Sequence, residues 1–438
     1  MSTNVATTSW YYPDRQPLWH FVSFWILLIP LLFFATKGGF LHPNDPAHMG
    51  EYTTSISSET ATQDRIEQIG IWLICLALML PKVREIFGDL FKFKLIMALP
   101  LLAILSAAWA PEPFESFRRG IYLLLTVVFG MYLAERYGPE QQMRLLLYVG
   151  YAAAILSLAV VVVAPRYGLG FAGEWKGIFG HKNDLGVFMI FLLTPAFHLR
   201  STSVGMQVGR ALYILTGLVL IYKSESKTAW VICLTYMAYV FAARYVGRFK
   251  RIDQAFLVLF AASLVLLVGF VVYQNLDVLT GILGKNATFS GRTRIWTAVM
   301  TSISKRPMLG YGYGGFWRGL TGESGNVISY VGFGVPHAHS GYLNIWLQIG
   351  AVGLGLFLTS LCIALRNVFA CFKPNRPMWV DWYAGLVLLI ILSNLDESYI
   401  LNINEMTTIL FVMAYIGLYR FARTHTDSLA DNRVASPA

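Results

Sequence analysis

Two histidines lie where a polar stretch of the chain meets a long apolar run. His337 and His339 belong to the sequence PHAHSGYLNIWLQIGAVGLG at residues 336–355. A neutral imidazole can take a proton from a hydroxyl group, which is the role of a general base, and nearby cations would lower its pKa and keep it unprotonated. The alternative is a passive polar side chain at a membrane surface. The pattern therefore raises the hypothesis of a catalytic histidine.

His339 is the better candidate of the two. It directly precedes the predicted helix, in which Gly350 and Gly353 follow at positions where a neighbouring element could pack closely. His337 follows Pro336 in a predicted loop, where it would support the base or contact an acceptor. Residues two apart point about 200° apart on a helix, so both rings cannot lie at the start of one helical face. We therefore predict His339 as the base.

Basic residues recur in the segments expected on the same side of the membrane as the histidines. Arginine offers phosphate oxygens a planar fork of donors, lysine offers a compact charge, and hydroxyl groups and helix N-termini add hydrogen bonds. Each residue alone could be an anchor at the membrane surface, but the groups together favour a binding site for a polyanion such as a lipid-linked diphosphate. The groups are Arg118 and Arg119; Lys176, His181, Lys182 and Asn183; Lys223, Ser224, Ser226, Lys227 and Thr228; and Arg292, Arg294 and Trp296.

The elements that must position these residues are apolar helices. The chain has 438 residues, of which 56% are hydrophobic and 13% charged, and its mean hydropathy is +0.56. A soluble domain would carry roughly a quarter charged residues. We predict an all-α polytopic membrane protein with about twelve transmembrane helices, each close to the length needed to cross a bilayer. The predicted spans are 20–36, 66–81, 95–110, 120–135, 145–164, 184–199, 208–223, 227–243, 254–273, 341–365, 379–395 and 404–420.

One large loop divides the chain. Residues 1–273 are predicted to hold transmembrane helices 1–9, residues 274–340 the loop, residues 341–421 helices 10–12, and residues 422–438 a cytoplasmic tail. With the long loop set aside, Lys and Arg are roughly twice as frequent in the segments that face the cytoplasm when both termini lie inside. The loop is therefore expected on the outer side.

The large loop is expected to be partly helical. Within GRTRIWTAVMTSISKR, Ile295, Val299 and Ile303 recur at helical spacing. The next stretch, LGYGYGGFWRGLTGESG, is glycine-rich and predicts a mobile flap with aromatic side chains. The alternative is a lid that only packs over the helix ends.

The sequence does not predict a metal centre. The cysteines, Cys75, Cys233, Cys362 and Cys371, fall within spans or at a cytoplasmic end, so we expect no disulfide, and their spacing is not typical of zinc. We find no Asp-x-Asp motif and no clustered outer carboxylates that would hold a divalent ion. We expect neither a metal nor another cofactor, and no nucleic-acid partner.

These motifs together resemble those of the bacterial O-antigen ligase and polysaccharide polymerase family. The resemblance rests on His339-Ser340 followed by nine residues, Gly, two residues and Gly, and on SESKTAW, SGRTRIW and SAAWAPEP in that family's order and outward placement. The stretch WKGIFGHKNDLG looks most like the exopolysaccharide polymerase branch. By motif, the resemblance covers roughly residues 100–360.

The resemblance implies a metal-independent, inverting glycosyltransferase of the GT-C class. Its donor would be an undecaprenyl-diphosphate-linked saccharide, used on the periplasmic side of the inner membrane, and its acceptor a saccharide or a lipid-linked saccharide. His339 would be the base, and Arg292 and Lys227 would hold the diphosphate, helped by Arg118 or Arg119. Ligases of this family commonly carry Arg at the position of Lys227, so a bidentate grip is lost there. Further implied partners are membrane lipids and a polysaccharide chain-length regulator or export machinery.

Several interpretations stay open at this point. A ligase that attaches the finished glycan to lipid A core or to a protein would share the donor site with a polymerase. A transporter or flippase of the same lipid-linked saccharide would need charged residues inside the spans, which are nearly free of charge. Aromatic side chains that could stack on sugar rings are Trp175, Tyr311, Tyr313 and Trp317.

Overall fold

Helices make up almost all of the chain for which the structure gives coordinates. The structure is a computed structural model that describes residues 18–37, 58–200, 203–246, 292–372 and 376–434. Within these residues the β-structure is one isolated bridge between Leu169 and Trp175. The all-α fold class predicted from the sequence is confirmed.

The helices vary from a single turn to more than eight turns. In chain order they are α1 (Leu18–Ile26), α2 (Leu28–Ala35), α3 (Ser58–Met79), η2 (Leu80–Lys82), α4 (Val83–Lys92), α5 (Lys94–Leu105), η3 (Ser106–Ala108), α6 (Pro113–Arg136), α7 (Pro139–Val163), α8 (Pro165–Gly168), α9 (Lys182–His198), α10 (Val204–Lys223), α11 (Lys227–Val246), α14 (Arg292–Lys305), α15 (Gly322–Val331), α16 (Gly341–Cys371), α17 (Met378–Asp396) and α18 (Met406–Val434).

The predicted spans coincide with these helices wherever the chain is described. The predicted span 254–273 lies outside the described residues. Within the described residues, six helical segments are long and apolar enough to cross a membrane. They are Arg65–Lys92, Pro113–Arg136, Pro139–Val163, Val204–Lys223, Gly341–Cys371 and Met378–Asp396. The first predicted span is interrupted, because α1 and α2 meet at Leu27.

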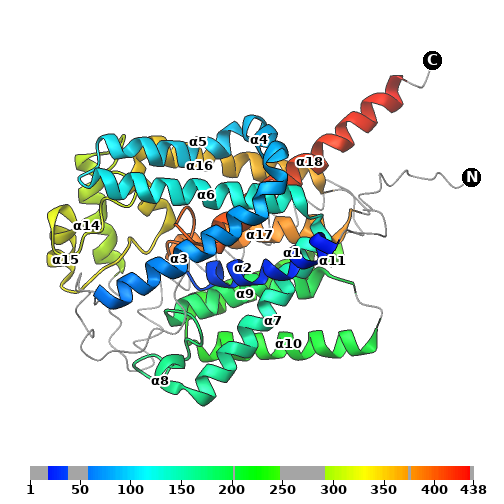
Figure 1. Ribbon diagram of the computed structural model, residues 1–438, viewed down its shortest axis with the longest axis horizontal. Coiled ribbons are helices and arrows are strands. Elements are labelled where there is room, and N and C mark those ends of the chain that lie inside the picture. Colours follow the sequence, from blue (N-terminus) through cyan, green and yellow to red (C-terminus); the bar gives the residue numbers. More distant parts are fainter. Residues whose placement is uncertain (1–17, 38–57, 201–202, 247–291, 373–375, 435–438) are drawn as a thin grey trace, which may run out of the picture.

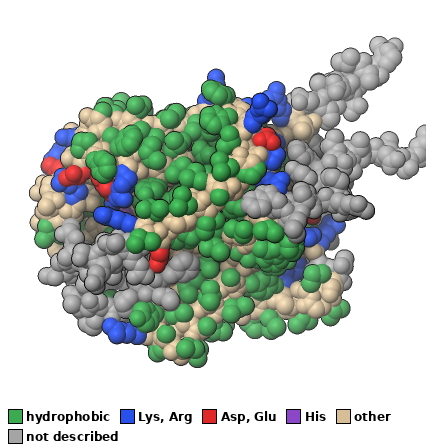
Figure 2. Space-filling model, viewed as in Figure 1, with side chains coloured by type: hydrophobic (Ala, Val, Ile, Leu, Met, Phe, Trp, Pro, Cys, Tyr) green, Lys and Arg blue, Asp and Glu red, His purple; other side chains and the backbone are tan. Residues whose placement is uncertain are grey.

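The helices run along the long axis of one bundle (Figure 1). Helices α14 and α15 lie at one end, whereas α1 begins and α18 ends towards the opposite end. The space-filling view shows a broad hydrophobic surface between two ends where charged side chains gather (Figure 2). Such a belt is what a helical bundle presents to the lipid hydrocarbon, since exposed apolar side chains are stable there.

Helix α9 carries three polar residues to one end of the bundle. Every residue from Leu185 to Ala196 is buried, as expected for a helix that is apolar on all sides. The helix packs against α7, α10, α11 and α17. Its first turn, Lys182–Asn183–Asp184, therefore emerges at the bundle end without freedom to move sideways.

Helix α16 is broken in its middle at Gly350. This residue has φ +70°, a left-handed conformation that favours glycine, and the carbonyl oxygen of Met308 would lie 2.0 Å from an added Cβ. The segment after α14 fills the break: Ala351 N donates to Pro307 O at 2.8 Å, and Tyr311 N donates to Leu347 O at 3.0 Å. The close packing predicted at Gly350 is confirmed, and its partner is the large loop.

The large loop has a small hydrophobic core of its own. The helix predicted there is α14, in which Ile295, Val299 and Ile303 are buried. Tyr311 and Phe316 of the glycine-rich stretch pack into the same cluster, together with residues of α15. The prediction of a mobile aromatic flap is therefore wrong for these side chains, because they are core residues that join α14 and α15 to α16.

Candidate active site

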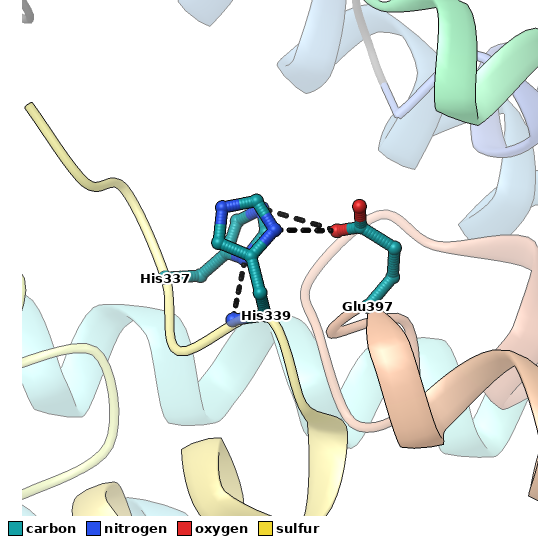
Figure 3. Close-up of side chains that lie close together, drawn as sticks. All are labelled: His337, His339 and Glu397. Carbon is teal, nitrogen blue, oxygen red and sulfur yellow. Dashed lines mark hydrogen bonds and ion pairs between the residues drawn. The ribbon is translucent and has the colours of Figure 1, made fainter. Parts of the chain in front are cut away.

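The carboxylate of Glu397, directly after α17, is the centre of a cluster of polar side chains. His339 Nδ1 lies 3.1 Å from Glu397 Oε2, and His337 Nε2 lies 3.8 Å from the same oxygen. Figure 3 shows the two rings, which overlap in this view, facing this carboxylate; their centroids lie 4.2 Å apart and their planes are tilted by 52°. Glu397 is almost fully buried, with 5% of its side chain exposed, whereas the two histidines are partly exposed.

His339 is held in a strained backbone conformation. Its φ is +46°, which is uncommon for a residue with a side chain. The amide of His339 donates to His337 Nδ1 at 3.2 Å, and the next helix begins at Gly341, whose amide donates to Glu397 O at 2.9 Å. Both histidines thus lie before α16, in bends of the chain. The helical spacing argument used to separate their directions is therefore wrong, and both rings reach one carboxylate.

Strained backbone recurs in the segments around this cluster. Among the described residues, the non-glycine positions with positive φ are Lys37, Glu225, His339, Leu401 and Asn404. Leu401 and Asn404 belong to the loop that follows Glu397, and Glu225 lies in the turn that leads to α11. Such conformations persist only where the surrounding structure fixes them, and they concentrate at functional sites.

Arg292, the first residue of α14, holds two neighbouring carboxylates. Its Nη1 lies 2.9 Å from Asp396 Oδ2, and its Nη2 lies 2.8 Å from Glu397 Oε1. Asn183 Nδ2 donates to the same Glu397 oxygen at 2.8 Å, and the hydroxyl of Thr228 donates to Asp396. The predicted residues Asn183, Arg292 and His339 thus meet, from three helix starts far apart in the sequence.

The protonation of the cluster follows from its contacts. Burial would raise the pKa of Glu397, but the hydrogen bond with His339 and the positive charge of Arg292 hold it well below its usual range. An ionised carboxylate only accepts, so His339 Nδ1 carries a proton, and in the neutral form of the ring Nε2 keeps the lone pair. Burial and the neighbouring His339 lower the pKa of His337 to about 3, so its ring is neutral. The arrangement presents Nε2 of His339 as a base.

The same three side chains have the composition of a metal site. One ligand atom each of His337, His339 and Glu397 lies within 4.8 Å of the others. A metal needs nitrogen lone pairs on the facing atoms. Here Nδ1 of His339 donates to the carboxylate, and Nδ1 of His337 accepts the amide proton, which leaves the proton of its neutral ring on the Nε2 that faces Glu397. A metal could bind here only if these hydrogen bonds were replaced and the facing nitrogens gave up their protons.

The paired arginines predicted to grip phosphate are engaged by a carboxylate in their own helix. Arg118 Nη2 lies 2.8 Å from Glu115 Oε1, and Arg119 Nε lies 2.5 Å from the same oxygen. The side chain of Arg119 also lies against Gly314 of the large loop. Both guanidinium groups are partly exposed, but the structure gives neither a contact with Glu397, Asp396 or the histidines.

The predicted residues of loop 165–183 border the cluster. His181 caps α9, since its Nδ1 accepts from Asn183 N at 3.2 Å, and the residue is exposed. Lys182 Nζ lies 3.7 Å from Glu174 Oε1. Lys176 is buried, which lowers its pKa. The loop also meets the turn between α10 and α11, where Trp175 N donates to Lys223 O at 2.9 Å.

The remaining predicted residues divide into structural and exposed positions. Ser226 is buried, and its hydroxyl accepts from Ala229 N at 3.4 Å within the first turn of α11. Lys227 is exposed beside it. Arg294 Nη2 donates to Tyr330 O at 3.1 Å, away from Glu397. Trp296 Nε1 donates to Ala338 O at 3.0 Å, and thereby ties α14 to the segment between the two histidines.

Two of the four predicted sugar-stacking aromatics cannot act as such in this structure. Tyr311 and Tyr313 are buried, and the Tyr313 hydroxyl donates to Leu401 O at 2.5 Å. Trp175 and Trp317 are partly exposed. Trp317 Nε1 donates to Asn344 Oδ1 at 2.9 Å, so its ring is fixed beside α16.

Sequence reasoning missed the acidic residues. The expectation that outer carboxylates do not cluster is wrong, because Asp396 and Glu397 lie together, and Asp184 and Glu405 lie nearby around Lys37. The available signal was the pair of acids in NLDESY at the end of an apolar span. Charged residues at such a place usually have a partner and a function.

The comparisons with known proteins concern the family of the chain. Residues 212–358, which include Lys227, Arg292 and His339, match the family model described as O-antigen ligase. The chain is also 24% identical, over 308 residues, to the exopolysaccharide production protein ExoQ of Rhizobium meliloti (strain 1021), which covers 67% of this chain and 69% of the relative. These matches confirm the resemblance of the chain to O-antigen ligases and to an exopolysaccharide production protein that its motifs predicted.

Proposed function

We propose that the protein is a metal-independent, inverting glycosyltransferase that polymerises undecaprenyl-diphosphate-linked saccharide units at the periplasmic face of the inner membrane. The observation that carries the proposal is the His339–Glu397–Arg292 cluster, which joins a positioned base to a fixed guanidinium group. The family match supports glycosyl transfer of the ligase or polymerase type. The motif resemblance favours the polymerase.

In the proposed reaction, Nε2 of His339 takes the proton from an acceptor hydroxyl. The hydroxyl oxygen then attacks the anomeric carbon of the donor, and the bond from that carbon to the diphosphate oxygen breaks with inversion. Glu397 stabilises the imidazolium that forms, because its carboxylate accepts from Nδ1. Arg292 uses one donor for each carboxylate, and its remaining N–H groups would donate to the leaving diphosphate.

The direct test is transfer with purified components. We expect the protein in detergent or nanodiscs, supplied with a lipid-linked repeat unit, to give a ladder of products and to keep its full rate in excess EDTA. A single adduct on lipid A core or protein would identify a ligase. Absence of any glycosyl product would contradict the proposal, and a rate restored by magnesium or manganese after EDTA would contradict metal independence.

The periplasmic orientation has its own test. Ser329 on α15 is exposed at the end of the bundle that carries the site, and Thr424 on α18 is exposed towards the other end. In a variant without its natural cysteines, Ser329→Cys should react with a membrane-impermeant maleimide in cells whose outer membrane is permeabilised. Thr424→Cys should react only after the inner membrane is lysed. The reverse pattern would place the site in the cytoplasm.

A further inference from the structure

Lys37 lies at the centre of a second charged cluster beside the active site. It follows α2 with φ +57°, a conformation in which glycine is the usual residue. Its Nζ lies 2.8 Å from Asp184 Oδ1, 3.4 Å from Glu405 Oε1 and 4.4 Å from the centre of the Tyr399 ring. A lysine kept in a strained backbone position indicates that its charge is required there.

The carboxylates around Lys37 depend on it. Glu405 is fully buried, and its side-chain oxygens make no hydrogen bond within the described residues, so Lys37 is its charge partner. Burial would lower the pKa of Lys37, but Asp184 and Glu405 together raise it well above its ordinary value. The lysine is therefore charged at neutral pH.

Each partner of Lys37 is connected along the chain either to a residue that holds Glu397 or to Glu397 itself. Asp184 follows Asn183, whose amide group donates to Glu397 Oε1 at 2.8 Å. Glu405 ends the loop that begins at Glu397, just before α18. We propose that Lys37 is a positioning residue: by holding Asp184 and Glu405 together, it fixes Asn183 and Glu397, and through Glu397 it orients the His339 base.

The charge of Lys37 also reaches the active site. It interacts electrostatically with Glu397, His337 and His181. The other groups that face the Lys37 cluster are the ring of Tyr399, the amide of Asn402 and, on the Glu405 side, Tyr313. Removing the positive charge of Lys37 would favour the protonated form of the His339 imidazole, which cannot act as a base. The acid limb of the pH–rate profile, where the rate falls as this base is protonated, should therefore move to higher pH.

This inference rests on the proposed function and is tested by the same transfer assay. Lys37→Met should lower kcat by on the order of 10²-fold, the cost of misplacing a catalytic group by about 1 Å. Its acid limb should move to higher pH, whereas Kd for the donor should change little. Lys37→Arg, which keeps the charge, should recover much of the rate. Lys305→Met is the matched control. Lys305 Nζ lies 2.8 Å from Glu323 Oε2, and this exposed ion pair does not belong to the active-site cluster.

A double variant keeps the test decisive if Lys37→Met does not fold. Lys37→Met with Asp184→Asn removes one charge of each sign, so the acid limb should return close to that of the wild type while kcat stays low. If Lys37→Met loses rate but the acid limb of its pH–rate profile does not move, Lys37 has only a structural role. If Lys37→Met behaves like Lys305→Met while His339→Ala is inactive, the Lys37 inference alone fails. If His339→Ala is fully active, the proposed function fails.

Discussion

Replacement of His339 by alanine should lower the rate of saccharide transfer by about 10² to 10⁴-fold, the usual contribution of a positioned base. Donor binding should be little changed, because the diphosphate is assigned to Arg292 rather than to the imidazole. The measurement is kcat with the purified lipid-linked donor, together with Kd for the donor in the absence of acceptor. A large increase in Kd with unchanged kcat would assign His339 to donor binding instead.

His337→Ala is the matched control, since the two rings face the same carboxylate. It should lose less activity than His339→Ala. Its ring is neutral, and its structural contribution is the hydrogen bond that Nδ1 accepts from the His339 amide at 3.2 Å. If His337→Ala is the inactive variant and His339→Ala the mild one, the base is assigned to the wrong histidine. If neither variant is slowed, the reaction does not use a histidine base.

Glu397→Gln tests the contact that defines the site. The amide keeps the shape of the side chain but removes the negative charge 3.1 Å from His339 Nδ1. The imidazolium then loses its partner, so the rate should fall. The acid limb of the rate profile should move to lower pH, opposite in sign to Lys37→Met. An unchanged profile in Glu397→Gln would show that the carboxylate does not act on the base.

The architecture could be predicted from the sequence because each long apolar helix is visible as a continuous run of hydrophobic residues. The break in α16 was visible only as glycine spacing; that Gly350 contacts the backbone of Met308 depends on the large loop, far away in the chain. The aromatic residues of that loop show the limit. Tyr311 and Tyr313 lie in a glycine-rich stretch typical of a flap, yet their rings are buried because α14, α15 and the helices beside them form a surface to pack against.

The candidate site was predicted in part for the same reason. His339 and Arg292 stand in recognisable local patterns, whereas their partner Glu397 lies 58 residues beyond His339. No local pattern joins residues that meet only through tertiary packing. The ion pairs of Arg118 and Arg119 with Glu115 could have been predicted, because Glu115 lies three and four residues before them in the same helix. That spacing places side chains on one helix face, so the signal was present in the sequence.

Arg292→Ala should lower kcat by roughly 10² to 10³-fold, the effect of removing a fixed donor from a developing negative charge. The loss has a second cause, since Asp396 and Glu397 would face each other without the guanidinium group that now joins them. Arg292→Lys should recover only part of the rate, because a single ammonium group cannot contact both carboxylates and the diphosphate in the geometry of a planar fork. Arg294→Ala, two residues further on, should lose far less, as its guanidinium donates to Tyr330 O and not to the cluster. Transfer rates, donor Kd and the amount of folded protein, measured on all three variants, decide the outcome. Full activity of Arg292→Ala at a normal protein level would leave the leaving group without its assigned cation, and the charge would then have to be stabilised by the lysines of the neighbouring loops, above all the exposed Lys227.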